Sequence, residues 1–318
     1  MMLFFQPFIR IWRSIDRNLM LFHPKVTLQY VFWTSLSLLF IFFNFAQAST
    51  NYFVEEKISE SFKQTQESES IVWLKTAEKR DILALHSPSI TSELQGGVVI
   101  LSDLYQTPDS PVIVHGLRTR LPIFGWETLS VQMPVPPSNP SIPELDSSYD
   151  LTRQRIESAI NYFKNKNISN IILIGISHSA NFSLKYAASF TAGNTKIQAI
   201  ICIKAFDSNW LTSSDLIKNI AIPILDILPE HDSDLIHKSA EKRLYSASFA
   251  GRLRAKPQTL ALSKKVQALA TNKTGNLRYR QKVINGANYQ FHKLEDTLDK
   301  VIRGWMSIYA SGTEVTVK

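Results

Sequence analysis

The stretch "NIILIGISHSANFSLKYAA", residues Asn170–Ala188, decides the fold. It opens with an apolar, β-branched run that is typical of a strand buried on both faces, and it continues as an Ala/Ser-rich segment compatible with a helix. Between the two lies "GISHS" at 175–179. Ser177 is therefore either a nucleophile on a sharp strand-to-helix turn or a small residue that caps an ordinary helix.

Strand-like and helix-like segments alternate on both sides of this stretch. Such an order predicts an α/β domain over residues 70–318, with a mainly parallel sheet and helices on both faces. The expected strands are 70–75, 81–87, 96–103, 125–135, 170–175, 197–205, 222–228 and 278–286, and the expected helical segments are 110–124, 147–166, the residues after Ser177, 234–272 and a last helix from about Leu294.

The N-terminal segment, 1–48, has the pattern of a secretory signal peptide. Basic residues precede an uncharged run, Val31–Ala46, which is short for a bilayer span of about 20 residues. The run leads into "AQA" at 46–48, the small-x-small pattern of a signal-peptidase site. We therefore expect a periplasmic or secreted protein in which residues 49–69 form a polar lead-in. An uncleaved inner-membrane anchor and a start at Met20 stay open.

The composition argues against several classes of site. Cys202 is the only cysteine, so an exported domain would rely on its core rather than on an internal disulfide. The 7 histidines are dispersed without zinc-ligand spacing, so we expect no metal and no cofactor. The net charge is +8, but the basic clusters carry no nucleic-acid-binding motif and indicate a solvated face. Nucleic acid is not an expected partner, and membrane association would come only through an uncleaved N-terminal segment.

Candidates for a catalytic triad follow the late strands, because a parallel α/β sheet binds ligands at the carboxyl ends of its strands. Ser177 would be the nucleophile. Asp232, four residues past Leu228, would be the carboxylate that orients the base, with Asp234 as second choice. His292 follows the last strand and completes the order serine, acid, histidine. A solvated helix N-cap explains Asp232 or Asp234 equally well.

From about residue 70 to the C-terminus, the chain resembles the α/β-hydrolase superfamily. More closely, it is similar to an exported proteobacterial family of α/β-hydrolase-like proteins of unknown function. The likeness is carried by "GGVVIL", "GLRTRLPIFGWETLSVQMP", "ILIGISHSA", "IPILDIL" and "INGANYQFH" followed by "IRGW". The resemblance implies the fold more strongly than a reaction. It also implies an oxyanion hole made by the backbone N–H groups of His178 and Leu104.

Two features depart from the pattern of active α/β-hydrolases. The last strand is typically followed by Gly-x-x-His, whereas this chain has "GANY" at 286–289, so that Tyr289 stands in the histidine slot. A phenol, with an ordinary pKa of about 10, is a poor general base at neutral pH. After the third strand, the usual His-Gly is replaced by Ser102-Asp103. The carboxylate of Asp103 would oppose the negative charge of an oxyanion.

Two functions from different classes stay open. The first is an exported serine hydrolase, carboxylesterase-like, that cleaves the ester, thioester or amide bond of a small-molecule or lipid-like acyl substrate. The second is a catalytically inactive α/β-hydrolase-like binding or assembly protein of the periplasm, which Tyr289 and Asp103 favour. A contact between His292 and Ser177 would favour the first, because a general base must reach the proton it removes.

Overall fold

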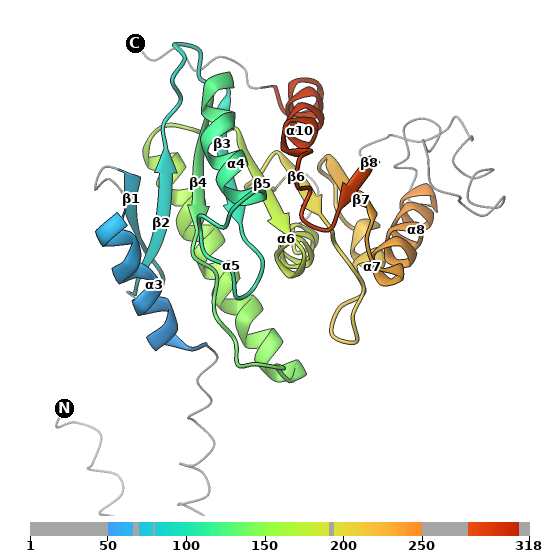
Figure 1. Cartoon of the computed structure of the whole chain (residues 1–318), viewed down its shortest axis with the longest axis horizontal. Coiled ribbons are helices and arrows are strands. Elements are labelled where there is room, and N and C mark those ends of the chain that lie inside the picture. Colours follow the sequence, from blue (N-terminus) through green and yellow to red (C-terminus); the bar gives the residue numbers. More distant parts are fainter. Residues whose placement is uncertain (1–49, 66–69, 79, 191–193, 250–278, 312–318) are drawn as a thin grey trace, which may run out of the picture. The chain divides into compact units, whose positions relative to one another are not determined.

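The structure, a computed structural model, describes residues 50–65, 70–78, 80–190, 194–249 and 279–311 (Figure 1). These residues belong to one unit, Ser49–Lys318. The expected signal segment, 1–48, and the part of the helix-prone region beyond residue 249 lie outside the described residues. Within the described ranges, none of the helices is both long enough and apolar enough to span a membrane.

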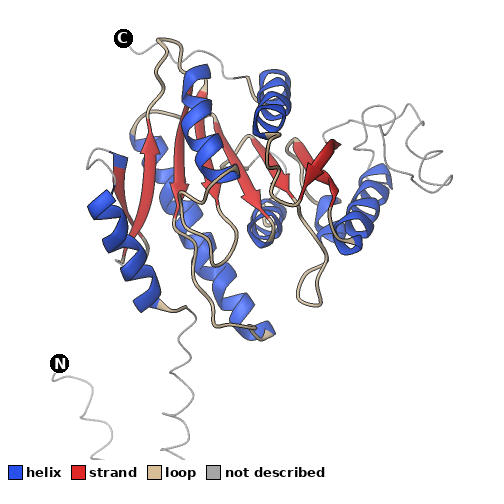
Figure 2. Cartoon of the chain, in the orientation of Figure 1, coloured by secondary structure: helices blue, strands red, loops and turns tan. Residues whose placement is uncertain are grey.

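Within the described residues, eight strands form one sheet in the order β1-β2-β4-β3-β5-β6-β7-β8 (Figure 2). β2 runs antiparallel to both of its neighbours, and the strands from β4 to β8 in this order are parallel. All of β3, β5 and β6 is buried, which explains their continuous apolar sequences. The predicted α/β architecture is confirmed. The strands are β1 (Ile71–Lys75), β2 (Asp81–Ser87), β3 (Gly96–Leu101), β4 (Trp126–Val131), β5 (Ile171–Ile176), β6 (Ala199–Ile203), β7 (Ile224–His231) and β8 (Tyr279–Asn288).

Helices cover both faces of this sheet (Figure 1). One buried cluster joins the sheet to α5 (Ile142–Asn165), α6 (His178–Ala188), α7 (Ser213–Ile217) and α8 (Asp234–Phe249). A second cluster joins the other face to α4 (Ile113–Arg120), which continues as the 3-10 helix η3 (Leu121–Phe124), and to α10 (Glu295–Tyr309). Since each face has its own apolar layer, the sheet is buried on both sides.

The polar segment 49–69, expected to precede the domain, contains the helix α3 (Tyr52–Thr65). Its Glu55 is buried and forms an ion pair with Arg155 of α5 at 2.8 Å. Arg155 also donates a hydrogen bond to the carbonyl of Gln132 at 2.7 Å. A buried ion pair rather than an apolar stripe fixes this helix, so hydrophobic periodicity did not indicate it. The helix α3 is therefore packed onto the folded domain.

The long helix α5 begins earlier than the predicted start at residue 147. Ser141 precedes it, and the Glu144 carboxylate accepts a hydrogen bond from the Ser141 backbone N–H at 2.7 Å. This hydrogen bond belongs to a capping box, and it satisfies a backbone donor that the helix leaves free. Pro143 lies in the first turn, where its missing N–H costs no helical hydrogen bond. The proline-rich sequence at 134–143 thus leads into the helix rather than interrupting it.

Candidate active site

Ser177 lies on the sharp turn between β5 and α6, with φ 53° and ψ −114°. A positive φ is uncommon for a residue with a side chain, and such a conformation costs about 1–3 kcal/mol. The Ser177 backbone N–H donates a hydrogen bond to the carbonyl of Ile203 on β6 at 2.8 Å. Residues held in strained conformations by a rigid sheet cluster at functional sites. The strain therefore makes Ser177 a candidate functional residue.

The residues on either side of Ser177 are small because backbones approach closely at this turn. A Cβ atom added to Gly175 would lie 2.6 Å from Ser183 Oγ and 2.7 Å from Ala180 Cα, which is too close for real atoms. Ser179 stands where the usual motif has a second glycine. It is fully buried, and its hydroxyl donates a hydrogen bond to the carbonyl of Ser102. The serine is thus accommodated, and it ties the start of α6 to the end of β3.

Tyr289, the residue in the expected histidine slot, has its side chain close enough to that of Ser177 for the two to interact. Burial of part of the ring and the negative charge of Asp103 raise the pKa of this phenol, although the interaction with Ser177 opposes the shift. The phenol therefore stays protonated at neutral pH. It can hold the serine hydroxyl in place, but it cannot remove the serine proton by itself.

His292 lies in the loop that connects β8 to α10. Its backbone N–H donates to Asn288 Oδ1 at 3.1 Å, and its Nδ1 lies 3.8 Å from Glu295 Oε1. The imidazole is 58% exposed, and within the described residues its ion pair is with Glu295 and not with Asp232. The neighbouring Phe291 is fully buried and anchors the loop. Its assignment as the general base stays a prediction that would require this loop to rearrange.

Asp232 comes directly after β7, at the carboxyl end of the sheet. Its Oδ1 accepts a hydrogen bond from the Ser233 backbone N–H at 2.7 Å, and its Oδ2 is buried without a hydrogen-bond partner in the described part of the chain. Its negative charge acts on Tyr289. Asp234, in contrast, begins α8, pairs with Lys238 at 3.4 Å and is 91% exposed. Asp232 therefore faces the serine site, whereas Asp234 is a solvated residue of a helix start.

Asp103 points into the place expected for an oxyanion. Its Oδ1 accepts hydrogen bonds from the backbone N–H groups of Leu104 at 2.9 Å and His178 at 3.1 Å. The same oxygen lies 2.9 Å from Nδ1 of the His178 imidazole, whose ring packs edge-on against Phe206. Two N–H groups thus converge on one anionic oxygen, as an oxyanion hole requires. In this structure that oxygen belongs to the protein itself.

Known proteins share this architecture. A dienelactone hydrolase from Anabaena variabilis aligns with 76% of this chain and 97% of its own, at 14% identity and a TM-score of 0.54. The α/β hydrolase GrgF from Penicillium sp. sh18 aligns over 76% and 98%, at 10% identity and a TM-score of 0.53. A serine hydrolase without a lid from Xanthomonas campestris aligns over 76% and 95%, at 14% identity and a TM-score of 0.51. The chain has the α/β-hydrolase fold.

The sequence of this α/β-hydrolase-fold protein also matches a family model. Residues 54–152 match the family described as "Protein of unknown function (DUF3530)". The matched segment runs from α3 into α5 and includes Asp103, but it ends before Ser177. No curated protein matches the sequence. The comparisons therefore show the fold.

The α/β-hydrolase-fold site contains one residue that sequence analysis did not single out, Lys204. It follows β6 with a φ of 58° and is 3% exposed. Its Nζ lies 3.4 Å from the centroid of the Tyr289 ring. Burial lowers the pKa of this amine to about 8, even though Asp103 and Asp232 act in the opposite direction. A lone lysine directly after the wholly apolar "AIICI" is the signal that could have indicated it.

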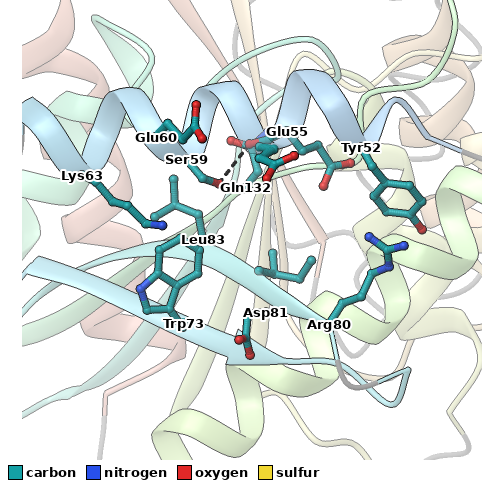
Figure 3. Close-up of a pocket in the computed structure, with 12 residues that line it drawn as sticks. Tyr52, Glu55, Ser59, Glu60, Lys63, Trp73, Arg80, Asp81, Leu83 and Gln132 are labelled. Carbon is teal, nitrogen blue, oxygen red and sulfur yellow. Dashed lines mark hydrogen bonds between the residues drawn. The ribbon is translucent and has the colours of Figure 1, made fainter.

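A separate cavity of about 330 Å³ lies between α3 and the strands β1 and β2 of the α/β-hydrolase fold (Figure 3). Its lining includes Tyr52, whose ring stacks with Arg80 at 3.7 Å, and Trp73. β1 is at the edge of the sheet, whereas β5, which carries Ser177, lies in the middle. This cavity is therefore distinct from the serine site.

Proposed function

We propose that this protein is a serine hydrolase that forms an acyl-enzyme at Ser177 from an ester, thioester or amide substrate. The observation that carries the proposal is the strained backbone of Ser177 at the strand-to-helix turn. Such a turn holds the hydroxyl above the carboxyl edge of the sheet and beside the start of α6, whose dipole favours negative charge. The Tyr289 side chain, which interacts with Ser177, would help to orient the hydroxyl.

The proposed reaction has two stages. Ser177 Oγ attacks the carbonyl carbon of the substrate and gives up its proton, and the bond between that carbon and its oxygen, sulfur or nitrogen leaving group then breaks. The leaving group departs with a proton, and water hydrolyses the acyl-serine ester. The N–H groups of Leu104 and His178 would stabilise the oxyanion once the Asp103 carboxylate has moved away from them.

The proton acceptor expected from sequence is His292, oriented by Asp232. For this role the imidazole would have to leave Glu295, and the loop around the buried Phe291 would have to refold. The role of Ser177 as the nucleophile does not depend on His292, because another group could accept the serine proton.

A fluorophosphonate probe tests the proposal directly, since it forms a covalent bond with an activated serine. We expect the wild-type protein to be labelled and Ser177→Ala to be unlabelled. Ser183→Ala, which removes another buried serine of α6, is the matched control and should be labelled like the wild type. Absence of labelling in the wild type at every pH between 6 and 10 would contradict the proposal.

The second candidate function, an inactive binding or assembly protein, is favoured by the position of Asp103. Its carboxylate occupies the N–H groups that catalysis needs. If neither the wild type nor an Asp103→Ala variant reacts with the probe, the fold serves binding rather than hydrolysis.

We also propose that the protein is exported through its N-terminal segment, on the strength of the apolar run and of the "AQA" at 46–48. The mass of the protein purified from a periplasmic extract tests this. A chain that begins at Ser49 supports cleavage, and a full-length chain in the membrane fraction supports an anchor. A full-length chain in the cytoplasmic fraction would contradict export.

A further inference from the structure

We propose that Lys204, rather than a histidine, accepts the proton of Ser177 Oγ, while the hydroxyl group of Tyr289 holds Oγ in place. The inference rests on the proposed function, in which Ser177 is the nucleophile. It gives a catalytic role to a lysine for which the sequence pattern indicated none.

The sheet brings Ser177 and Lys204 side by side. β5 and β6 are parallel neighbours, and their last paired residues are Ile176 and Ile203. Ser177 directly follows Ile176 of β5, and Lys204 directly follows Ile203 of β6. Adjacent strands lie about 5 Å apart. The Ser177 N–H donates a hydrogen bond to the carbonyl of Ile203 at 2.8 Å, which keeps the two strand ends together beyond their last paired residues. The four-carbon stem of a lysine can span this separation.

Both of these residues have positive φ angles, 53° for Ser177 and 58° for Lys204. Neither is a glycine, an asparagine or an aspartate, the residues that tolerate this region best. Two adjacent strand ends therefore carry strained residues that bear a nucleophile and an amine. Strain of this kind persists where the surrounding structure holds it, and it concentrates at functional sites.

The amine of Lys204 is buried, and no ion pair with it is found in the described part of the chain. Within the described residues its Nζ makes no hydrogen bond or salt bridge, and its close contact is the face of the Tyr289 ring at 3.4 Å. The Tyr289 side chain in turn interacts with that of Ser177, so the amine, the phenol and the serine form one contiguous group. A buried ammonium that lacks a partner is costly, and this cost favours the neutral amine, which is a base.

Charged groups from the neighbouring strand ends surround Lys204. Asp103 after β3 and Asp232 after β7 act on the amine from a distance, and Tyr289 after β8 lies against it. His178, at the start of α6, is engaged by Asp103 at 2.9 Å. Burial lowers the pKa of Lys204 by more than the two carboxylates raise it, which leaves the pKa at about 8. A base whose pKa lies near the working pH suits general-base catalysis.

In the proposed step, the neutral Nζ takes the proton from Ser177 Oγ as the bond between Oγ and the substrate carbonyl carbon forms. The electron pair of the carbonyl moves to its oxygen and returns when the bond to the leaving group breaks. The ammonium of Lys204 gives its proton to that leaving group. In the second stage the regenerated amine removes a proton from water, and the acid product and free Ser177 result.

The experiment follows fluorophosphonate labelling rates from pH 6 to pH 10 in the wild type, Lys204→Met, Lys204→Arg and His292→Gln. We expect the wild-type rate to rise with a midpoint near pH 8, because the neutral amine is required. The labelling rate should fall at least about 100-fold in Lys204→Met and in Lys204→Arg, since methionine is no base and a guanidinium does not deprotonate. His292→Gln tests the rival base, because a histidine that accepts the proton would be lost in this variant. Near-UV circular dichroism of each variant confirms that it is folded.

The outcomes separate this inference from the proposed function. Labelling of the wild type with a midpoint near pH 6.5, together with its loss in His292→Gln, would overturn the role of Lys204 and leave the serine hydrolase intact. Wild-type rates in Lys204→Met would do the same. A wild type that is not labelled at any pH would remove the proposed function and this inference with it. The pH profile of the wild type needs no variant, so a Lys204 variant that does not fold leaves the inference testable.

Discussion

The Asp103 carboxylate accepts a hydrogen bond at 3.1 Å from the backbone N–H of His178, the first residue of the helix that follows Ser177. The Leu104 N–H bonds to the same oxygen at 2.9 Å. These donors would stabilise the oxyanion of a substrate, so the carboxylate competes with the transition state for them. An acidic side chain thus holds the donor pair that the proposed reaction needs.

Removal of this competitor should speed the reaction. We expect Asp103→Ala to be labelled by the fluorophosphonate probe about tenfold to a hundredfold faster than the wild type, because one oxyanion-hole donor alone is worth about a hundredfold or more. Loss of the carboxylate also removes a charge that raises the pKa of Lys204, which acts in the same direction. Asp296→Ala, which removes an exposed carboxylate paired with Arg120, should be labelled at the wild-type rate. Slower labelling of Asp103→Ala would show that Asp103 assists the reaction instead.

The buried amine of Lys204 should destabilise the protein in a pH-dependent way. Its pKa is about 8 in the folded chain, whereas a lysine in an unfolded chain has a pKa of about 10.4. Between these values the unfolded state binds more protons, so the free energy of unfolding rises with pH over this range. Lys204→Met should therefore be more stable than the wild type at pH 7, by up to about 3 kcal/mol, and this gain should shrink toward pH 10.

Urea unfolding at pH 7, 8, 9 and 10 measures this difference. Lys238→Met, which removes a lysine that is 73% exposed, is the matched control and should give a difference from the wild type that does not change with pH. A Lys204→Met variant whose stability relative to the wild type is constant from pH 7 to pH 10 would contradict the lowered pKa.

The turn before Ser177 should tolerate no side chain at Gly175. A Cβ there would come within 2.6 Å of Ser183 Oγ and 2.7 Å of Ala180 Cα, so the start of α6 would have to move. We expect Gly175→Ala to lose about 3 kcal/mol of unfolding free energy in urea. Gly116, on α4, has open space around it, and Gly116→Ala should gain about 0.5–1 kcal/mol from helix propensity. Equal effects of the two substitutions would contradict the close packing at the turn.

A buried ion pair beneath the sheet should be sensitive to removal of one partner. Arg243 of α8 pairs with Asp226 of β7 at 2.8 Å, and both side chains are almost fully buried. Arg243→Met should cost about 3–5 kcal/mol in urea unfolding, because it leaves the Asp226 carboxylate buried without its cation. Arg153→Met, at an exposed pair with Asp150 of 3.8 Å, should change the stability by less than about 0.5 kcal/mol. A small effect at Arg243 would indicate that water or Tyr279 compensates Asp226.

The sheet could be predicted from the sequence because each of its central strands is indicated by a short apolar run of neighbouring residues. The apolar runs that became β3, β5 and β6 are buried throughout, and a short run of β-branched residues between turn residues is typical of a central parallel strand. α3 was missed as a packed element for the opposite reason. It is held by the buried pair of Glu55 and Arg155, two residues that are 100 positions apart in the chain.

The position of Ser177 could be predicted because a strand, a glycine and a helix in sequence define the turn. Its partners could not, since they come from other strand ends. Lys204 stood inside an expected strand and looked like part of it, and its orientation depends on the left-handed backbone at its own position. Asp103 was expected to oppose an oxyanion, but its hydrogen bonds to Leu104 and His178 are visible only when the loop after β3 and the start of α6 are folded together.

The buried Oδ2 of Asp232, which has no hydrogen-bond partner among the residues that the structure describes, affects which molecules can enter the site. When Lys204 is neutral, the carboxylates of Asp232 and Asp103 leave the surroundings of Ser177 with negative charge, although the whole chain carries +8. A carboxylate or phosphate on the acyl group of a substrate would then be repelled at short range, where salt screens little. Uncharged or cationic acyl groups should therefore react faster than anionic ones of the same size.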